Sequence, residues 1–188
     1  MSEIFVEHNI DDLQKKLSGL PANVTRRVMR EVAQMAERET LKRYQRTTST
    51  WSNRPQFESA TDYTATTASV IVGTDNPIYG FVDKGTGLWG PKRSKYPIRP
   101  KRPGYPLRFQ SGYRAKTTPG VIGSGGGGPF GPTVRAWEVM HPGIKTRGFT
   151  ALIYREINAM MLRKIMDSLH KAIRGYLPVS VGRMRRAR

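Results

Sequence analysis

The chain has 188 residues, and its 32 Lys and Arg against 14 Asp and Glu give a formal net charge of +18. Such a charge predicts a polyanionic partner or an acidic protein surface, and it says nothing about the fold. The chain has no cysteine, which excludes a disulfide framework, a cysteine-based zinc site and a thiol nucleophile.

The first clear element is a helix that begins at Leu20-Pro21 and fades near residues 47–50. Proline suits the first helical turn because its missing N–H would have no partner there. A short strand or arm and a short helix are expected before it, over residues 4–17. Apolar side chains recur three or four positions apart, which places them on one helix face: they are Val24, Val28, Val32, Met35 and Ala36.

Strand composition follows the first helix. Residues 57–72 are rich in Thr, Val and aromatic residues, and "GTDNP" after them predicts a turn. "IYGFVDKG" then predicts another strand with Tyr79, Phe81 and Asp83 on one side. Further short strands are expected at Tyr96–Arg99, at Pro106–Phe109 and over residues 133–140, where apolar and polar residues alternate.

The strongest helix begins near Phe149 and keeps apolar residues at helical spacing for about six turns of 3.6 residues, with Gly175 as its stop. We expect its stripe of Leu152, Ile153, Ile157, Met160 and Met161 to face the sheet, with Arg163 and Lys164 nearer to solvent.

The order of helix, strands, long loop, strand and helix predicts an α+β fold rather than the alternation of a parallel sheet. We expect a small antiparallel sheet packed by an N-terminal and a long C-terminal helix. A single domain would then span residues 1–188, with an extended Pro/Gly-rich loop at about 85–133 and a basic tail at 183–188.

Residues suited to catalysis or metal binding are scattered. His8, His141 and His170 lie in three different segments, none beside a second ligand-type residue at metal spacing. The glycines of "GSGGGGPFG" match a nucleotide-binding spacing, but prolines and no helix follow, so a flexible linker is expected. Ser168 and Lys171 match an S-x-x-K spacing without its companion motifs, and no carboxylate pair stands out. We therefore predict a protein that is not an enzyme, with no catalytic residues, cofactor or metal.

The extended loop contains no Asp or Glu between Lys84 and Trp137. Cations interleaved with aromatic residues can bind single-stranded nucleic acid by neutralising phosphates and stacking bases. Alternatively, the aromatic residues anchor the loop on a neighbouring subunit, and the many prolines favour this because they stiffen an extended arm. The candidate subunit or DNA contacts are Lys92, Arg93, Lys95, Arg99, Lys101, Arg102, Arg108, Trp89, Tyr96 and Tyr105.

Three segments carry motifs in a recognisable order: "VGTDNPIYGFVDKGTG" (72–87), "IRPKRPGYPLRF" (98–109) and "HPGIKTRGF" (141–149). Together they resemble the tail-completion, or tail-component, proteins of long-tailed bacteriophages, and the likeness extends from the first helix to the last. Asp83 stands where that family usually has Glu, Gly148 stands where Pro is usual, and the Gly-rich stretch 119–132 is unusually long. The residues at family positions are Tyr79, Phe81, Val82, Asp83, Gly85, Thr86, His141, Pro142, Gly143 and Phe149.

The resemblance implies a structural virion protein with a tail-tube or terminator-like fold. It would form a ring at the phage neck, complete the tail and join it to the head connector. The implied partners are further copies of the chain, the adaptor and stopper proteins of the connector, tail-terminator or tail-tube proteins, and packaged DNA in the channel.

Localisation and alternatives follow from the same observations. No signal peptide is expected, and no apolar run approaches the roughly 18 residues that span a membrane. We therefore expect assembly in the host cytoplasm, a place in the virion and no membrane partner. The alternative is a basic nucleic-acid-binding protein of the cytosol. A phage-encoded hydrolase is a third possibility, for which the sequence offers no catalytic set.

Overall fold

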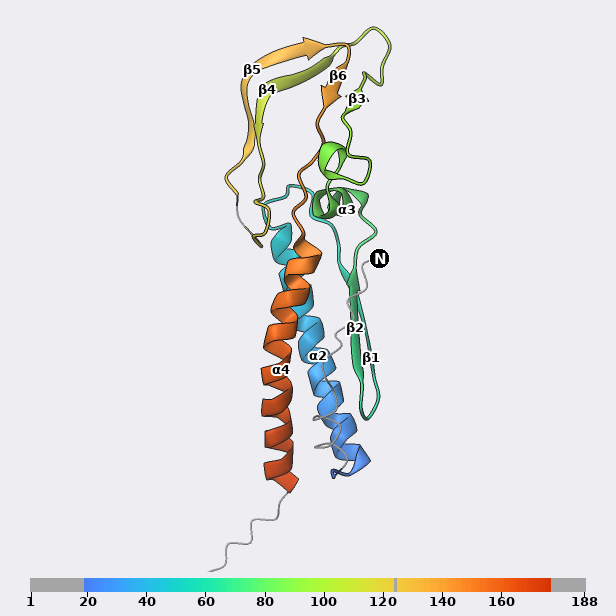
Figure 1. Ribbon diagram of the computed structural model, residues 1–188, viewed down its shortest axis with the longest axis vertical. Coiled ribbons are helices and arrows are strands. Elements are labelled where there is room, and N and C mark those ends of the chain that lie inside the picture. Colours follow the sequence, from blue (N-terminus) through green and yellow to red (C-terminus); the bar gives the residue numbers. More distant parts are fainter. Residues whose placement is uncertain (1–18, 124, 177–188) are drawn as a thin grey trace, which may run out of the picture.

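A computed structural model of the chain describes residues 19–123 and 125–176. The molecule is elongated, with two long helices running side by side along its length (Figure 1). A β-hairpin lies along one of these helices, and the remaining strands extend from the far end (Figure 1). The predicted helix and strand and the basic tail that fall on residues 1–18 and 177–188 lie outside the described residues.

The helix predicted from Leu20-Pro21 is confirmed as α2, Ala22–Thr47, with Pro21 as its N-cap residue. The last helix is confirmed as α4, Phe149–Tyr176. Ile153, Ile157 and Met161 on α4 are at most 2% exposed, because they pack against the apolar face of α2. The expectation that this stripe faces the sheet is therefore wrong: α2 occupies that position.

The strand-like composition of residues 57–72 corresponds to an antiparallel hairpin of β1, Glu58–Tyr63, and β2, Ala68–Gly73. The turn between them is closed by a hydrogen bond from Thr64 N to Thr67 O, 2.8 Å. Alternate residues face α2, and Val72 is fully buried there. The order of layers is thus α4, α2 and then the hairpin.

The predicted strand around Tyr79 is wrong, since residues Pro77–Lys84 form the helix α3. Asn76 caps it, because its side-chain oxygen accepts hydrogen bonds from Ile78 N (2.9 Å) and Tyr79 N (3.3 Å), and Pro77 occupies the first turn. Tyr79 and Asp83 are four residues apart and share the buried face, as helical periodicity requires.

The predicted long loop, residues 85–133, contains short regular elements separated by turns and irregular segments. After the short 3₁₀ helix Gly87–Trp89, strand β3, Tyr96–Ile98, pairs with β6, Val139–His141. Strand β4, Leu107–Arg114, pairs with β5, Gly128–Ala136. The short strands expected near residues 96 and 106 are thus confirmed.

Two corrections follow from these pairings. The described residues form three two-stranded antiparallel sheets rather than one sheet. The end of the Gly-rich stretch is also not a free linker, because β5 already begins at Gly128 and runs through Pro129 and Pro132. An antiparallel edge tolerates both prolines, since the missing N–H can face away from the partner strand.

The core runs along α2 and α4 and includes Tyr79 of α3. Tyr79 lies at the centre of an aromatic cluster, with ring centroids 5.1 Å from Phe57, 6.0 Å from Tyr44 and 6.3 Å from Phe149. Burying large aromatic side chains contributes much of the stability of a small domain. The long helices and α3 are therefore joined by one apolar cluster, and the remaining strands project from it.

Candidate interaction surface

The first and third predicted motif segments lie against each other. Thr86 N donates to Ile144 O (2.9 Å), and Ile144 N donates to Thr86 Oγ1 (2.9 Å). Leu88 N donates to Pro142 O (2.8 Å). We call residues 83–89 with 141–150 the junction. The junction connects the helical body, which we define as α2, α3, α4 and the β1–β2 hairpin, to strands β3 to β6. Most of the predicted motif residues therefore have a structural role here.

Two glycines make this close approach of backbones possible. Gly85 ends α3 with φ of 80°, and Gly143 has φ of 99°, both in the region that favours glycine. A Cβ at Gly143 would stand 2.1 Å from Thr86 O, and one at Gly85 would stand 2.5 Å from Thr146 Oγ1. Any side chain at either position would force the two segments apart.

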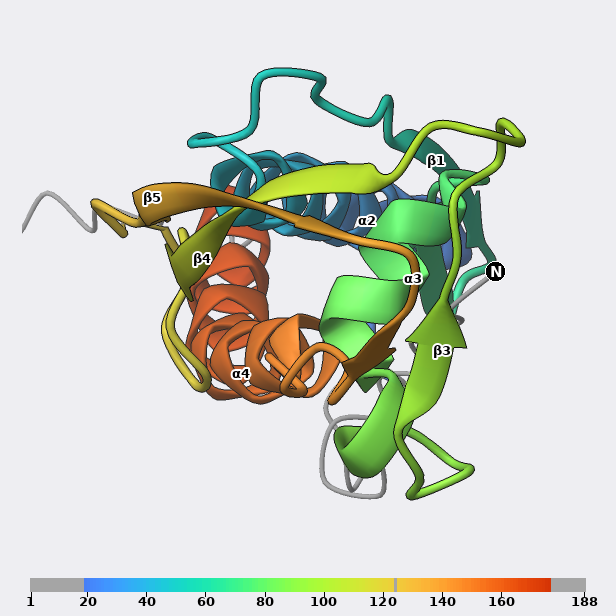
Figure 2. The same ribbon diagram turned by 90° about the horizontal axis from the view of Figure 1, so that it is seen from above.

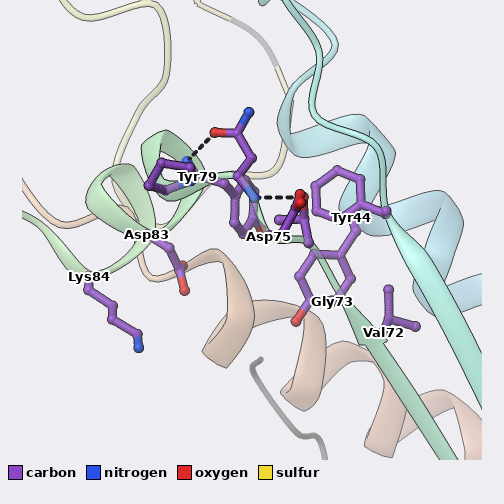
Figure 3. A pocket seen from close by; sticks show the side chains of 12 residues that line it. Tyr44, Val72, Gly73, Asp75, Tyr79, Asp83 and Lys84 are labelled. Atoms are coloured by element: carbon purple, nitrogen blue, oxygen red, sulfur yellow. Dashed lines mark hydrogen bonds between the residues drawn. The ribbon is translucent and has the colours of Figure 1, made fainter.

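Asp83 caps α4 from α3. Its Oδ1 accepts a hydrogen bond from Thr150 N (3.1 Å), and its Oδ2 accepts one from the Thr150 hydroxyl (2.7 Å). The Asp83 carbonyl also accepts from Gly148 N (3.0 Å). Figure 3 shows the carboxylate projecting from α3 toward the ribbon of α4. A negative charge there complements the positive end of the helix dipole, so the Asp83 carboxylate stabilises the fold.

A small pocket of about 260 Å³ opens beside this cap, lined by residues from α2, β2 and α3 (Figure 3). Tyr44, Val72 and Tyr79 line it with apolar surface, and Asp83 and Lys84 lie on α3 at its edge. Burial raises the pKa of both tyrosines above the ordinary value. The pocket is therefore lined by a carboxylate already bound to Thr150 and by two phenols that are neutral near pH 7.

His141 is part of the junction rather than a free side chain. Its Nδ1 accepts a hydrogen bond from Gly143 N (3.0 Å), and its ring lies 5.4 Å from that of Tyr96. Within the described residues, no group of three or more His, Asp or Glu side chains gathers as metal ligands would.

Except for Trp89 in the junction, the predicted contact residues lie on what we call the arm, residues 91–141, which carries strands β3 to β6. All seven predicted cations are exposed, and Arg99 forms an ion pair with Glu138 at 2.6 Å. Tyr105 is 68% exposed, and Tyr96 and Trp89 are also exposed. The residues occupy both sheets of the arm and the segments between them, so they do not gather in one cleft.

The β4–β5 pair has chemically different faces near the start of β4. Phe109 lies opposite Val134, both 39% exposed, and Arg108 lies opposite Arg135 on the other face. Like charges directly opposite each other destabilise a strand pair. Arg135 was not among the predicted contact residues, because it is distant from Arg108 in the sequence and only the β4–β5 register places the two opposite each other.

The arm also exposes apolar side chains that were not among the predicted contacts. Trp137, Met140 and Phe130 are each at least half exposed. Arg114 stacks over the ring of Phe130, with 5.4 Å between its guanidinium carbon and the ring centroid. Side chains alternate between the two faces of a strand, so this pattern could identify the exposed apolar residues only if the partner strands were already known. Exposed apolar side chains and cations on one part of a molecule are typical of an interaction surface.

Comparison with protein-family models, with curated proteins and with solved structures finds no match to this chain. No helix in the described part of the chain is long and apolar enough to cross a membrane.

Proposed function

We propose that this chain is a structural protein of the phage neck, which forms a ring, completes the tail and joins it to the head connector. The observation that supports this best is the arm. It consists of two-stranded sheets with exposed apolar residues, and isolated two-stranded sheets are at most marginally stable in water. An arm of this kind gains stability when a neighbouring surface covers it.

The proposed role requires no turnover and no cofactor. Copies of the chain in a ring would each place the apolar face of Phe109 and Val134 on a neighbour. Many weak contacts then add up, because each contact after the first forms within one assembly. The partners are further copies of the chain, connector proteins and tail-terminator or tail-tube proteins, with DNA in the channel as an additional partner. The protein would be assembled in the host cytoplasm and remain in the virion.

A deletion of the gene tests this role in the phage that encodes the chain. We expect DNA-filled heads with separate or defective tails under electron microscopy, and restoration by the complete gene. If the deletion phage makes normal infectious particles and the protein is absent from virions, the proposal fails.

Complementation with arm variants tests the surface itself. Removing residues 92–116 would leave β5 and β6 without partner strands, so substitutions are cleaner. We expect Phe109→Ser together with Trp137→Ser to fail in joining while folding normally. Leu162→Ser is a matched control, since Leu162 is an exposed apolar residue on α4, 56% exposed and outside the arm. Equal activity of both variants would contradict a role for the arm.

Nucleic-acid binding is a second candidate, favoured by the opposed Arg108 and Arg135. Arg108→Gln with Arg135→Gln should remove up to two phosphate contacts, which would reduce the slope of log affinity against log salt by about 1.4–1.8. A gel shift with duplex and single-stranded DNA over a range of salt concentrations measures this. Unchanged slope and affinity would exclude the pair as a phosphate site.

A further inference from the structure

The most unusual charged group in the described residues is Arg147, which is 7% exposed. Its Nε donates to Thr117 Oγ1 (2.9 Å), and its Nη1 donates to the Lys145 carbonyl (2.8 Å). Both acceptors are neutral. No carboxylate in the described part of the chain lies within ion-pair distance of Arg147. Buried charges in proteins are normally paired, because removing an ion from water is costly.

Hydrogen bonds hold the backbone of Arg147 from two sides. Arg147 N donates to Val82 O at the end of α3 (3.1 Å), and Arg147 O accepts from Gly120 N in the connection after β4 (3.1 Å). Together with the guanidinium hydrogen bonds to Thr117 and Lys145, these backbone bonds order the side chain before any ligand arrives, which lowers the entropic cost of binding. Burial also lowers the pKa of Arg147 from its ordinary value, as expected for a cation that lacks a negative neighbour.

Arg147 lines a hollow of about 550 Å³ between the helical body and the arm. That volume is within the range of binding pockets for small ligands and side chains. Aromatic walls come from Trp51, Tyr96 and Tyr113, and Lys116 adds a second cation. No Asp or Glu lines the hollow. Its chemistry thus combines positive charge in the interior with apolar walls.

We propose that this hollow receives a carboxylate side chain, Asp or Glu, that is flanked by an apolar or aromatic residue on a partner protein. A carboxylate matches the planar guanidinium through charge-assisted hydrogen bonds. The Thr117 hydroxyl accepts from Arg147 and retains its own hydrogen, which it can donate to the same carboxylate. The identity of the partner as a neighbouring neck subunit rests on the proposed function, but the binding chemistry does not.

A nucleic-acid backbone fits the hollow less well. Its phosphates are spread along an exposed strand, whereas Arg147 lies beneath aromatic walls and presents little surface to solvent. The many exposed cations of the arm offer phosphates a more accessible surface. They would also attract an acidic protein segment toward the hollow.

Titration of the full chain, followed by NMR, tests the proposal. The probe is N-acetyl-phenylalanyl-aspartyl amide, and its neutral counterpart carries Asn in place of Asp. The signals to follow are Arg147 Nε–H and the backbone amides of Lys116 and Thr117. We expect saturable shifts with the Asp peptide and at least tenfold weaker binding of the Asn peptide. Inorganic phosphate at matched ionic strength should leave the signals unchanged.

Variants give the assignment its specificity. Arg147→Lys keeps the positive charge but loses the planar donor pair, and should weaken binding of the Asp peptide at least tenfold. Lys116→Gln removes the second cation of the hollow without changing Arg147, so it should weaken binding of the Asp peptide. This variant keeps the proposal testable if Arg147→Lys fails to fold. Lys145→Gln is the matched control, because that exposed side chain does not line the hollow, and it should bind like the unaltered chain.

Three results would overturn the proposal. Equal binding of the Asn and Asp peptides would show a merely apolar pocket. Shifts caused by phosphate or a short oligothymidylate, but not by the Asp peptide, would show a phosphate site. The absence of any shift would show that the hollow binds none of these groups. Each result concerns the isolated chain, so none of them decides whether the gene deletion leaves heads and tails unjoined.

Discussion

Replacing Asp83 with Ala should destabilise the protein, because Asp83 caps α4. The substitution removes both hydrogen bonds to Thr150, one to its backbone N–H and one to its hydroxyl, and it leaves that N–H partly buried without this partner. Loss of a helix cap typically costs about 0.5–2 kcal/mol. Loss of a hydrogen bond to a charged group costs about 1.5–3 kcal/mol.

These two costs overlap, because the same interactions are counted in both, so we expect a loss of about 2–3 kcal/mol in the free energy of unfolding. For a chain of this size each kcal/mol shifts the melting temperature by about 2–4 °C, so the expected decrease is about 4–12 °C. Circular dichroism at 222 nm during heating measures it, with urea titration as a second estimate.

Two further substitutions separate the cap from the loss of charge. Asp83→Asn keeps an oxygen that can accept from Thr150 N but removes the negative charge near the positive end of α4, so its cost should be smaller. Asp167→Ala, at an exposed position on α4, should change the melting temperature little. If Asp83→Ala is as stable as Asp167→Ala, the cap does not stabilise α4 and the reasoning is wrong.

Other expectations concern the core, the buried phenols and the exposed ion pairs. Ile157→Ala should cost about 2–5 kcal/mol of stability, whereas the exposed Lys164→Ala should leave the melting temperature unchanged; equal effects would mean that the α4 face is misassigned. Burial raises the pKa of Tyr79, so the unfolded chain ionises first and stability should fall as pH rises above about 10. Tyr79→Phe should weaken that fall. Near neutral pH it should not destabilise the protein, because Tyr79 Oη has no hydrogen-bond partner in the described residues, although Thr47 lies beside it. A decrease of several °C in the melting temperature at pH 7 would contradict this. Arg43 donates a hydrogen bond to Glu39 and so lowers the pKa of that carboxyl. A small stabilisation should therefore be present above about pH 4.5 and be lost as the pH falls below it. Arg43→Met should remove this dependence, and an unchanged loss of unfolding free energy at acid pH in urea titrations would refute it.

The sequence predicted the long helices well because their signals are long and redundant. Nine apolar positions at helical spacing specify α4, and Pro21 marks the start of α2. The short helix α3 was predicted as a strand because Tyr79, Phe81 and Asp83 also fit a period of two. The Asn76-Pro77 pair, interpreted as part of a turn, was in fact the N-terminal signal of a helix.

The arm and the hollow show what pattern reasoning could not supply. Pro and Gly in residues 85–133 indicated a loop, yet β4 and β5 pair across it, and such pairing depends on residues distant in sequence. The opposition of Arg108 and Arg135 follows from that register. Arg147 had no signal of its own: one arginine among many becomes distinctive only when the fold buries it beside Thr117 and aromatic walls.

The junction determines how experiments on this protein should be interpreted. The position of the arm relative to the body is fixed by hydrogen bonds between Thr86 and Ile144, one of them to the Thr86 hydroxyl, and by a backbone hydrogen bond between Leu88 and Pro142. The same short segment continues through Arg147 into the Asp83 cap of α4. A variant of the junction should therefore lose both stability and assembly, and assembly loss alone would not identify a contact surface. Exposed residues such as Phe109 and Trp137 lie outside these hydrogen bonds, so a joining defect with an unchanged melting temperature at those positions would locate the interface.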